Sequence, residues 1–397
     1  MNLHTKEDMD LPKQKIKNIE FLRFIFSIMI IYVHILQFSV WTYNLYPEFP
    51  LYVKLYHKCL DSYLCVDYFF IVGGFFLYRT LLKKNLSTLE YAKNRFIRLW
   101  PLLALSIFLF WVLSLFNICN FYSYGNLLSL FFLYDSFFKE HLVDFYFNNG
   151  CSWFICSLFW CSIFYHYLYK NFDKKATNLI IALIICYSYT TILNYSEGTI
   201  TGVSFKTISG TSGGLLRGLG GLGLGYFIGM FWQNFGNKIQ NVEIKSKLKA
   251  AFVFLTVSAL EIYIFIFLIY NSLFHQISYR NDFVLILIFC ILFVSFLAQK
   301  GLLSILLDNK LSEFLGKYAY SIYIMQGIGL AIANYFIWSN KAFVLSHPYL
   351  NIAATMLICV LIGALPPPPE MLDTRAFKAY TPINSIFSKQ KIFISLT

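Results

Sequence analysis

Apolar residues along this chain gather into long continuous blocks, and short polar segments separate one block from the next. Most blocks hold roughly 17–23 residues, which is enough for a helix to cross the ~30 Å hydrocarbon core of a membrane. Because the apolar positions do not alternate with polar ones, the pattern predicts helices and not the strands of a membrane barrel. Ten blocks fit this description: 19–39, 59–79, 99–118, 150–169, 178–194, 213–233, 250–270, 282–299, 318–338 and 348–365.

A further apolar stretch, 127–138, has only 12 residues and is expected to be interfacial or re-entrant. The spans divide the chain into a cytosolic N-terminal segment at 1–18, a membrane domain at 19–365 and a cytosolic tail at 366–397. The tail begins with a run of prolines, which cannot continue the last helix. We therefore expect no separate soluble domain, so that any chemistry takes place in the membrane or at its edges.

Composition supports the same fold class. Apolar residues make up 58% of the chain and charged residues 13%, whereas about a quarter of the residues in a soluble domain are charged. This balance excludes a soluble enzyme, a disordered chain, a small disulfide-rich secreted domain and a DNA-binding protein. The sequence thus predicts an all-α polytopic membrane protein with about ten transmembrane helices.

The net charge of +12 is informative because of how the cations are distributed. If the N-terminus is placed in the cytoplasm, 24 of the 32 Lys and Arg residues fall in cytosolic segments and 6 in outer segments. Cytosolic loops of membrane proteins carry such an excess of cations. Both termini are therefore expected to be cytoplasmic.

The first span contains two ionisable residues, Arg23 and His34, and such groups are costly inside a membrane. They are eleven residues apart, which places them about 20° from the same helix face and about 16 Å apart along the axis. Alternatively, Arg23 extends to the cytosolic interface and His34 is an interfacial or hydrogen-bonded core residue. Their shared face favours a common site.

A second pair of cations, Arg95 and Arg98, lies three residues apart at a cytosolic membrane edge and so shares a helix face. Forked guanidinium donors match the oxygens of phosphate, which makes the pair a candidate phosphate site. The alternative is ordinary anchoring of the helix at the membrane surface.

Four further polar residues lie within spans and need partners. Asp67 requires a cation or a ring of donors. Arg217 lies among glycines whose spacing predicts a helix-packing face. Glu261 is in the middle of its span, where a buried cation is a candidate partner, and Gln326 is deep enough to require a hydrogen-bond partner.

Together these residues resemble the motifs of the membrane-bound acyltransferase family 3, whose members acylate cell-surface sugars. The resemblance runs from about residue 16 to 365, and its motifs occur in the family's order and spacing. The matching segments are Arg23 to His34 (Arg-x10-His), Val66–Phe75 (Asp-x-Phe-Phe-x-x-Ser-Gly-Phe), Arg95–Pro101 (Arg-x-x-Arg-hydrophobic-x-Pro) and Tyr320–Ile324 (Tyr-Ser-Ile-Tyr-Leu), with a weaker echo around Trp153.

The chain departs from the family pattern at two positions. Gly73 stands where the family usually has Ser, and Gln326 stands where many members have His. No histidine is therefore available at position 326 to take part in the reaction, and the chemistry is expected to depend more heavily on His34.

The resemblance implies an O-acyltransferase of the bacterial plasma membrane, surrounded by lipid, which moves an acetyl group from cytosolic acetyl-CoA to a polysaccharide hydroxyl. His34 would act as general base, since imidazole titrates near neutral pH. Arg23 would hold donor phosphates or stabilise negative charge, while Arg95 and Arg98 would bind CoA phosphates.

No bound cofactor, metal or nucleic acid is expected. A transporter or flippase for a sugar or lipid-linked oligosaccharide is the alternative, because buried charges also line substrate paths; the internal symmetry common in transporters is not visible. Candidate pocket residues are Asp67, Trp153, Arg217, Glu261, Tyr323 and Gln326.

Overall fold

The computed structural model describes residues 16–42, 50–119, 133, 151–201, 204, 206–242, 246–274 and 282–366. Within these residues the chain is almost entirely helical, and one two-residue hairpin pairs β1 (Thr207–Ile208) with β2 (Thr211–Ser212). Residues 1–15, the predicted cytosolic tail after residue 366 and, apart from Leu133, the predicted interfacial stretch 127–138 lie outside the described residues.

Each predicted span coincides with a helix. The helices are α1 (Lys17–Thr42), α3 (Cys65–Lys83), α4 (Thr88–Leu115), α6 (Ser152–Asn171), α7 (Lys174–Tyr195), α8 (Gly213–Gln240), α9 (Lys247–Phe274), α10 (Asp282–Ala298), α12 (Lys310–Ala333) and α14 (Pro348–Ala364). Seven helices in the described part of the chain are long and apolar enough to cross a membrane, while α10 and α14 are shorter apolar helices. The chain is therefore a helical integral membrane protein, and the count of ten crossings stays a prediction.

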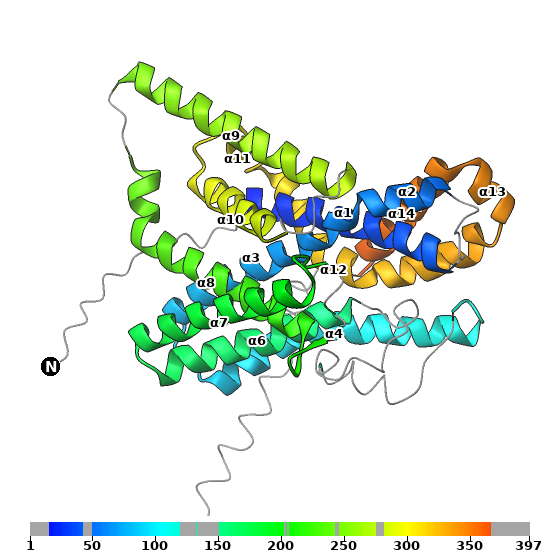
Figure 1. Ribbon diagram of the computed structural model, residues 1–397, viewed down its shortest axis with the longest axis horizontal. Helices are drawn as coiled ribbons and strands as arrows, with labels where there is room; N and C mark the ends of the chain where they lie inside the picture. The colour runs from blue at the N-terminus through cyan, green and yellow to red at the C-terminus, as the bar shows by residue number, and fades with distance from the viewer. Residues whose placement is uncertain are drawn as a thin grey trace, which may run out of the picture.

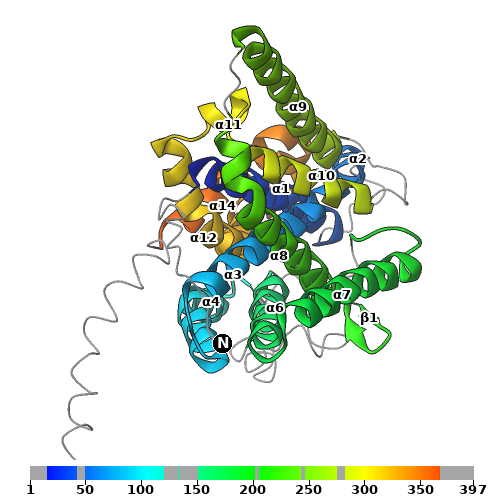
Figure 2. The same cartoon turned by 90° about the vertical axis from the view of Figure 1, so that its left-hand side faces the viewer.

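Short elements connect the long helices. They are α2 (Pro50–Lys58), the 3-10 helix η1 (Leu60–Leu64), α11 (Leu302–Leu306), the π-helical turn η3 (Asn334–Trp338) and α13 (Lys341–Ser346). In Figure 1, α4, α6 and α7 lie on one side of the centrally placed α3 and α8, and α9, α10 and α11 lie on the other side. Figure 2 shows the same division from the end, with α1, α12 and α14 beside α3.

Glycines allow α3 and α8 to pack closely. A Cβ atom added at Gly225 would overlap the carbonyl group of Ile71, and one added at Gly74 would overlap that of Leu222. Contact of backbone against backbone is what small residues at such spacing permit between membrane helices. The helix-packing role predicted for the glycines of this span is confirmed.

The first span packs in parallel against α12. Glu20 lies against Gly316, the Ser27 hydroxyl donates to the Ala319 carbonyl at 3.1 Å, and His34 contacts Gln326 further along both helices. In contrast, α12 and α14 are antiparallel, because Gly329 meets Cys359 while the earlier residue Ile322 meets Gly363. Both directions agree with the predicted alternation of spans, which assigns α1 and α12 the same direction.

Candidate functional site

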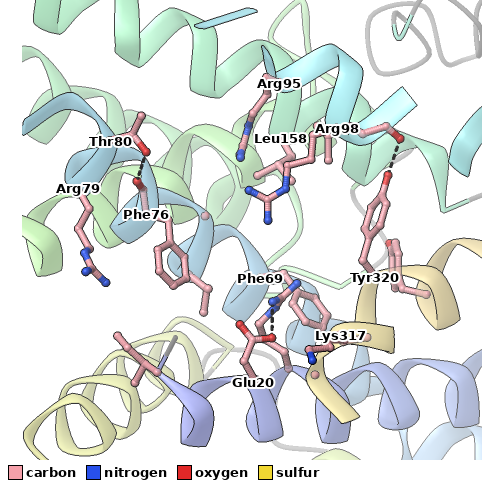
Figure 3. A pocket seen from close by; sticks show the side chains of 18 of the residues that line it. Glu20, Phe69, Phe76, Arg79, Thr80, Arg95, Arg98, Leu158, Lys317 and Tyr320 are labelled. Carbon is pink, nitrogen blue, oxygen red and sulfur yellow. Dashed lines mark hydrogen bonds and ion pairs between the residues drawn. The ribbon is translucent and has the colours of Figure 1, made fainter. Parts of the chain in front are cut away.

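A cavity of about 440 Å³ lies among α1, α3, α4, α6 and α12. Seven cationic side chains and one carboxylate contribute to its wall, as Figure 3 shows in part. This excess of positive charge makes the cavity suited to an anionic ligand. The charged residues are Glu20, Arg23, Arg79, Lys83, Lys84, Arg95, Arg98 and Lys317.

Local sequence signals place the cations of α4 at this cavity. The helix begins after Ser87, whose hydroxyl accepts the Glu90 amide while the Glu90 carboxylate accepts the Ser87 amide at 2.8 Å. This reciprocal cap fixes where the helix starts. Arg95 and Arg98 then fall on one face, and both side chains line the cavity (Figure 3).

The opposite end of the cavity is aromatic. The ring centroids of Phe154 and Tyr323 are 5.3 Å apart, and those of Phe69 and Tyr323 are 6.1 Å apart. Phe69 and the cationic residue Arg79 are ten residues apart on α3, which is about 15 Å of helix. The cavity thus combines a cationic end, on the predicted cytosolic side, with an apolar end deeper among the helices.

Arg23 lines this cavity from α1. Its guanidinium donates to the Glu20 carboxylate at 2.7 Å, and the side chain keeps 26% of its surface exposed. A partly exposed, singly paired guanidinium retains donors for a ligand, since it carries five N–H groups.

His34 lies further along the same helix and is 8% exposed. Its Nδ1 is 2.8 Å from the Gln326 Oε1 atom, while the Gln326 amide nitrogen donates to the Tyr323 carbonyl at 2.8 Å and contacts the Cys151 sulfur at 2.9 Å. His34 is not among the described residues that line the cavity. It is joined to the cavity wall through Gln326 and the lining residue Tyr323.

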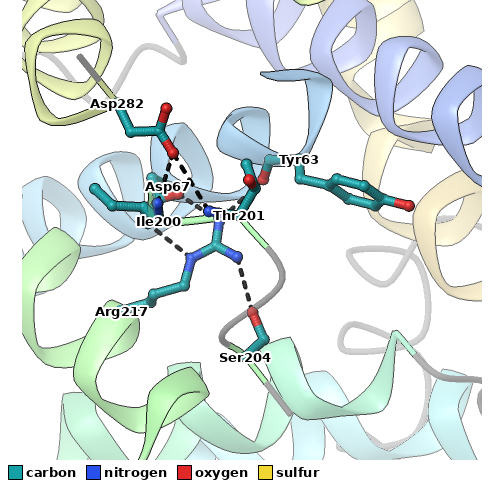
Figure 4. Close-up of polar contacts among 7 residues, drawn as sticks. All are labelled: Tyr63, Asp67, Ile200, Thr201, Ser204, Arg217 and Asp282. Carbon is teal, nitrogen blue, oxygen red and sulfur yellow. Dashed lines mark hydrogen bonds and ion pairs between the residues drawn. The ribbon is translucent and has the colours of Figure 1, made fainter. Parts of the chain in front are cut away.

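The buried Asp67 has the cationic partner that the sequence requires. Its carboxylate pairs with the Arg217 guanidinium at 2.5 Å, and both side chains are almost fully buried. Arg217 also donates to the Ser204 hydroxyl at 2.8 Å and to the Tyr63 carbonyl at 2.9 Å (Figure 4). Its guanidinium carbon lies 5.2 Å from the ring centroid of Trp153. This cluster ties α3, α8 and the start of α6 together beside the cavity.

Glu261 does not pair with a buried cation, as its position in the sequence suggested, but accepts hydrogen bonds from two serines among the described residues. Its carboxylate accepts a hydrogen bond from the Ser295 hydroxyl at 3.0 Å and another from the Ser304 backbone amide at 3.1 Å. A carboxylate at a helix start satisfies amides that lack an intrahelical acceptor. Glu261 therefore holds the start of α11, away from the described lining of the cavity.

Of the six predicted pocket residues, Tyr323 lines the cavity, and Gln326 lies directly behind it. Asp67, Trp153 and Arg217 form the neighbouring buried cluster. Sequence reasoning did not single out four of the lining cations, although all four belong to predicted cytosolic segments rich in Lys and Arg. These are Arg79, Lys83, Lys84 and Lys317.

Comparison with known protein families gives a match across the membrane domain. The model of acyltransferase family 3, described as an acyltransferase domain, matches residues 16–366. No curated protein and no solved structure matches the chain. The match covers most of the 397 residues and includes the cationic cavity and His34. The chain therefore belongs to the membrane-bound acyltransferase family 3.

Proposed function

We propose that this protein transfers an acetyl group from acetyl-CoA to a hydroxyl of a cell-surface or exported polysaccharide. Family membership establishes an acyltransferase of the membrane, which requires an acyl donor and an acceptor. The observation that carries the finer proposal is the cavity, which is cationic at one end and joined at the other, through Tyr323 and Gln326, to His34.

The cationic end suits the phosphates of a CoA donor. Arg95 and Arg98 present forked donors from one helix face, and Arg23 approaches from α1. Charge-assisted hydrogen bonds from guanidinium to phosphate are strong and directional. With phosphates held here, the pantetheine arm extends toward the aromatic end, where its apolar portions lie against Phe69, Phe154 and Tyr323.

The chemical step requires a base for the acceptor hydroxyl, and His34 is our candidate. Its imidazole takes the hydroxyl proton as the oxygen attacks the thioester carbonyl. The new C–O bond forms, the C–S bond breaks, and the departing sulfur receives the proton from the imidazolium. His34 lies about 16 Å along α1 from Arg23, which allows the donor to enter from the cytosolic face and the acceptor from the outer face.

The transporter alternative has the buried Arg217 in its favour, but this residue is engaged by Asp67, Ser204 and Tyr63. Mass analysis of the surface glycan separates the two functions. A strain lacking this protein should display the same amount of glycan with repeat units lighter by an acetyl group. A normal repeat mass with less glycan displayed would contradict the acetyltransferase proposal.

A further inference from the structure

The side chain of Gln326 has a fixed orientation. A backbone carbonyl can only accept hydrogen bonds, so the group facing the Tyr323 carbonyl at 2.8 Å must be the amide nitrogen of Gln326. The amide oxygen therefore points to His34, whose Nδ1 lies 2.8 Å away. Gln326 is 1% exposed, so that water does not compete for these contacts.

This orientation determines which imidazole nitrogen carries the proton. An amide oxygen can only accept, so the His34 Nδ1 must donate. In neutral imidazole the second nitrogen, Nε2, then holds a lone pair and has no proton. A hydrogen bond to one ring nitrogen is the usual means by which a protein selects a histidine tautomer.

The His34 ring is also in contact with Tyr63 of η1. The Tyr63 ring lies 5.6 Å from the His34 ring, and the Tyr63 hydroxyl donates to Gln37, one turn after His34, at 2.6 Å. The titratable neighbours Tyr63, Cys151 and Tyr323 belong to residue types that are ordinarily neutral at pH 7. The imidazole is thus held between α12 and η1.

We propose that Gln326 is a positioning residue that fixes His34 in the tautomer protonated at Nδ1, leaving Nε2 to take the proton of the acceptor hydroxyl. The inference rests on the proposed function and deepens it. It also gives the residue that replaces a histidine common in the family a defined role. The amide oxygen supplies the acceptor that keeps the base in its competent form.

Nitrogen NMR of the protein in membranes tests the tautomer directly. Protein labelled with 15N at its seven histidines is compared with the His34→Gln variant, and the missing signals identify His34. The expected spectrum shows a protonated Nδ1 and an unprotonated Nε2. A protonated Nε2 in the neutral ring would overturn the inference, and this measurement requires no variant at position 326.

Kinetics with variants provide a second test. Gln326→Leu removes the acceptor and should lower kcat for acetyl transfer by about 100-fold, the low end of a general-base contribution, with the KM for acetyl-CoA unchanged. Gln326→Glu keeps an acceptor for the His34 Nδ1 and adds a negative charge. It should therefore be more active than Gln326→Leu, and the acidic limb of its pH profile should shift to higher pH. A merely structural role would not produce this shift.

The outcomes separate the inference from the proposed function. If His34→Gln is inactive while Gln326→Leu keeps the wild-type kcat and pH profile, Gln326 does not position the base, although His34 remains the catalytic group. If His34→Gln is fully active, the proposed general base is itself wrong. His347→Gln, which changes a histidine on the loop before α14, is the matched control and should behave as wild type.

Discussion

The carboxylate of Asp67 on α3 and the guanidinium of Arg217 on α8 form an ion pair 2.5 Å long from which solvent is excluded. Breaking a buried pair by removing one partner leaves an unpaired charge and costs about 3–5 kcal/mol. Asp67→Ala and Arg217→Ala should therefore each lower the Tm of the detergent-purified protein and its yield in membranes.

A double-mutant cycle isolates the interaction between these two residues. Combining Asp67→Ala with Arg217→Ala removes both charges, and the double variant should lose less stability than the sum of the losses in the two single variants. Additive losses would show that the pair does not stabilise the packing of α3 against α8.

The cationic cavity should determine affinity for the donor. Arg95→Ala and Arg98→Ala each remove charge-assisted hydrogen bonds worth about 1.5–3 kcal/mol, and should raise the KM for acetyl-CoA by roughly 10- to 100-fold. Their kcat should change little, because the phosphates are distant from the bond that breaks. Lys249→Ala, an exposed cation on α9, is the control and should leave the KM unaltered. An unchanged KM in the arginine variants would place the donor elsewhere.

Close packing of α3 and α8 should not tolerate a side chain at Gly225. Gly225→Leu places a branched side chain against the Ile71 carbonyl and should reduce folded protein, measured by size-exclusion chromatography in detergent. Ala251→Leu adds similar bulk at an exposed position on α9 and should be neutral. Equal behaviour of the two variants would contradict the tight helix contact.

Reporter fusions test the predicted orientation. A fluorescent protein fused after Gln299 should fluoresce, because this loop is expected in the cytoplasm, and alkaline phosphatase fused after Asn340 should be active outside it. The reverse pattern would invert the topology and would place the cationic cavity on the outer face, away from cytosolic acetyl-CoA.

Three of the seven cations at the cavity could be singled out from the sequence, because a charged group at or inside a membrane is costly and points to a function. The sequence predicts Arg23, Arg95 and Arg98 near one membrane edge, and the structure brings the three side chains to one cavity. The buried position of Asp67 required a partner, but spacing could not identify Arg217, which is 150 residues away in the sequence.

The hydrogen-bond partners of His34 and Glu261 could not be derived from the pattern of hydrophobic and polar residues. The contact between His34 and Gln326 depends on the register of α1 against α12, which the packing of Glu20 on Gly316 helps to set. Glu261 was expected near a buried cation. Instead, the helix α11 begins after Gly301, and the backbone amide of Ser304 in its first turn donates a hydrogen bond to the Glu261 carboxylate. Neither the register between two packed helices nor a new helix start inside the membrane domain produces a periodic pattern in the sequence.

Acetyl transfer is proposed to depend on His34 as the general base. The most direct measurement is transfer of radiolabelled acetyl from acetyl-CoA to surface polysaccharide by the purified protein in lipid vesicles, with wild type, His34→Gln and His347→Gln compared at equal insertion. If His34 is the base, kcat of the His34→Gln protein should fall at least about 100-fold, while His347→Gln should match wild type. Wild-type transfer by the His34→Gln protein would contradict it.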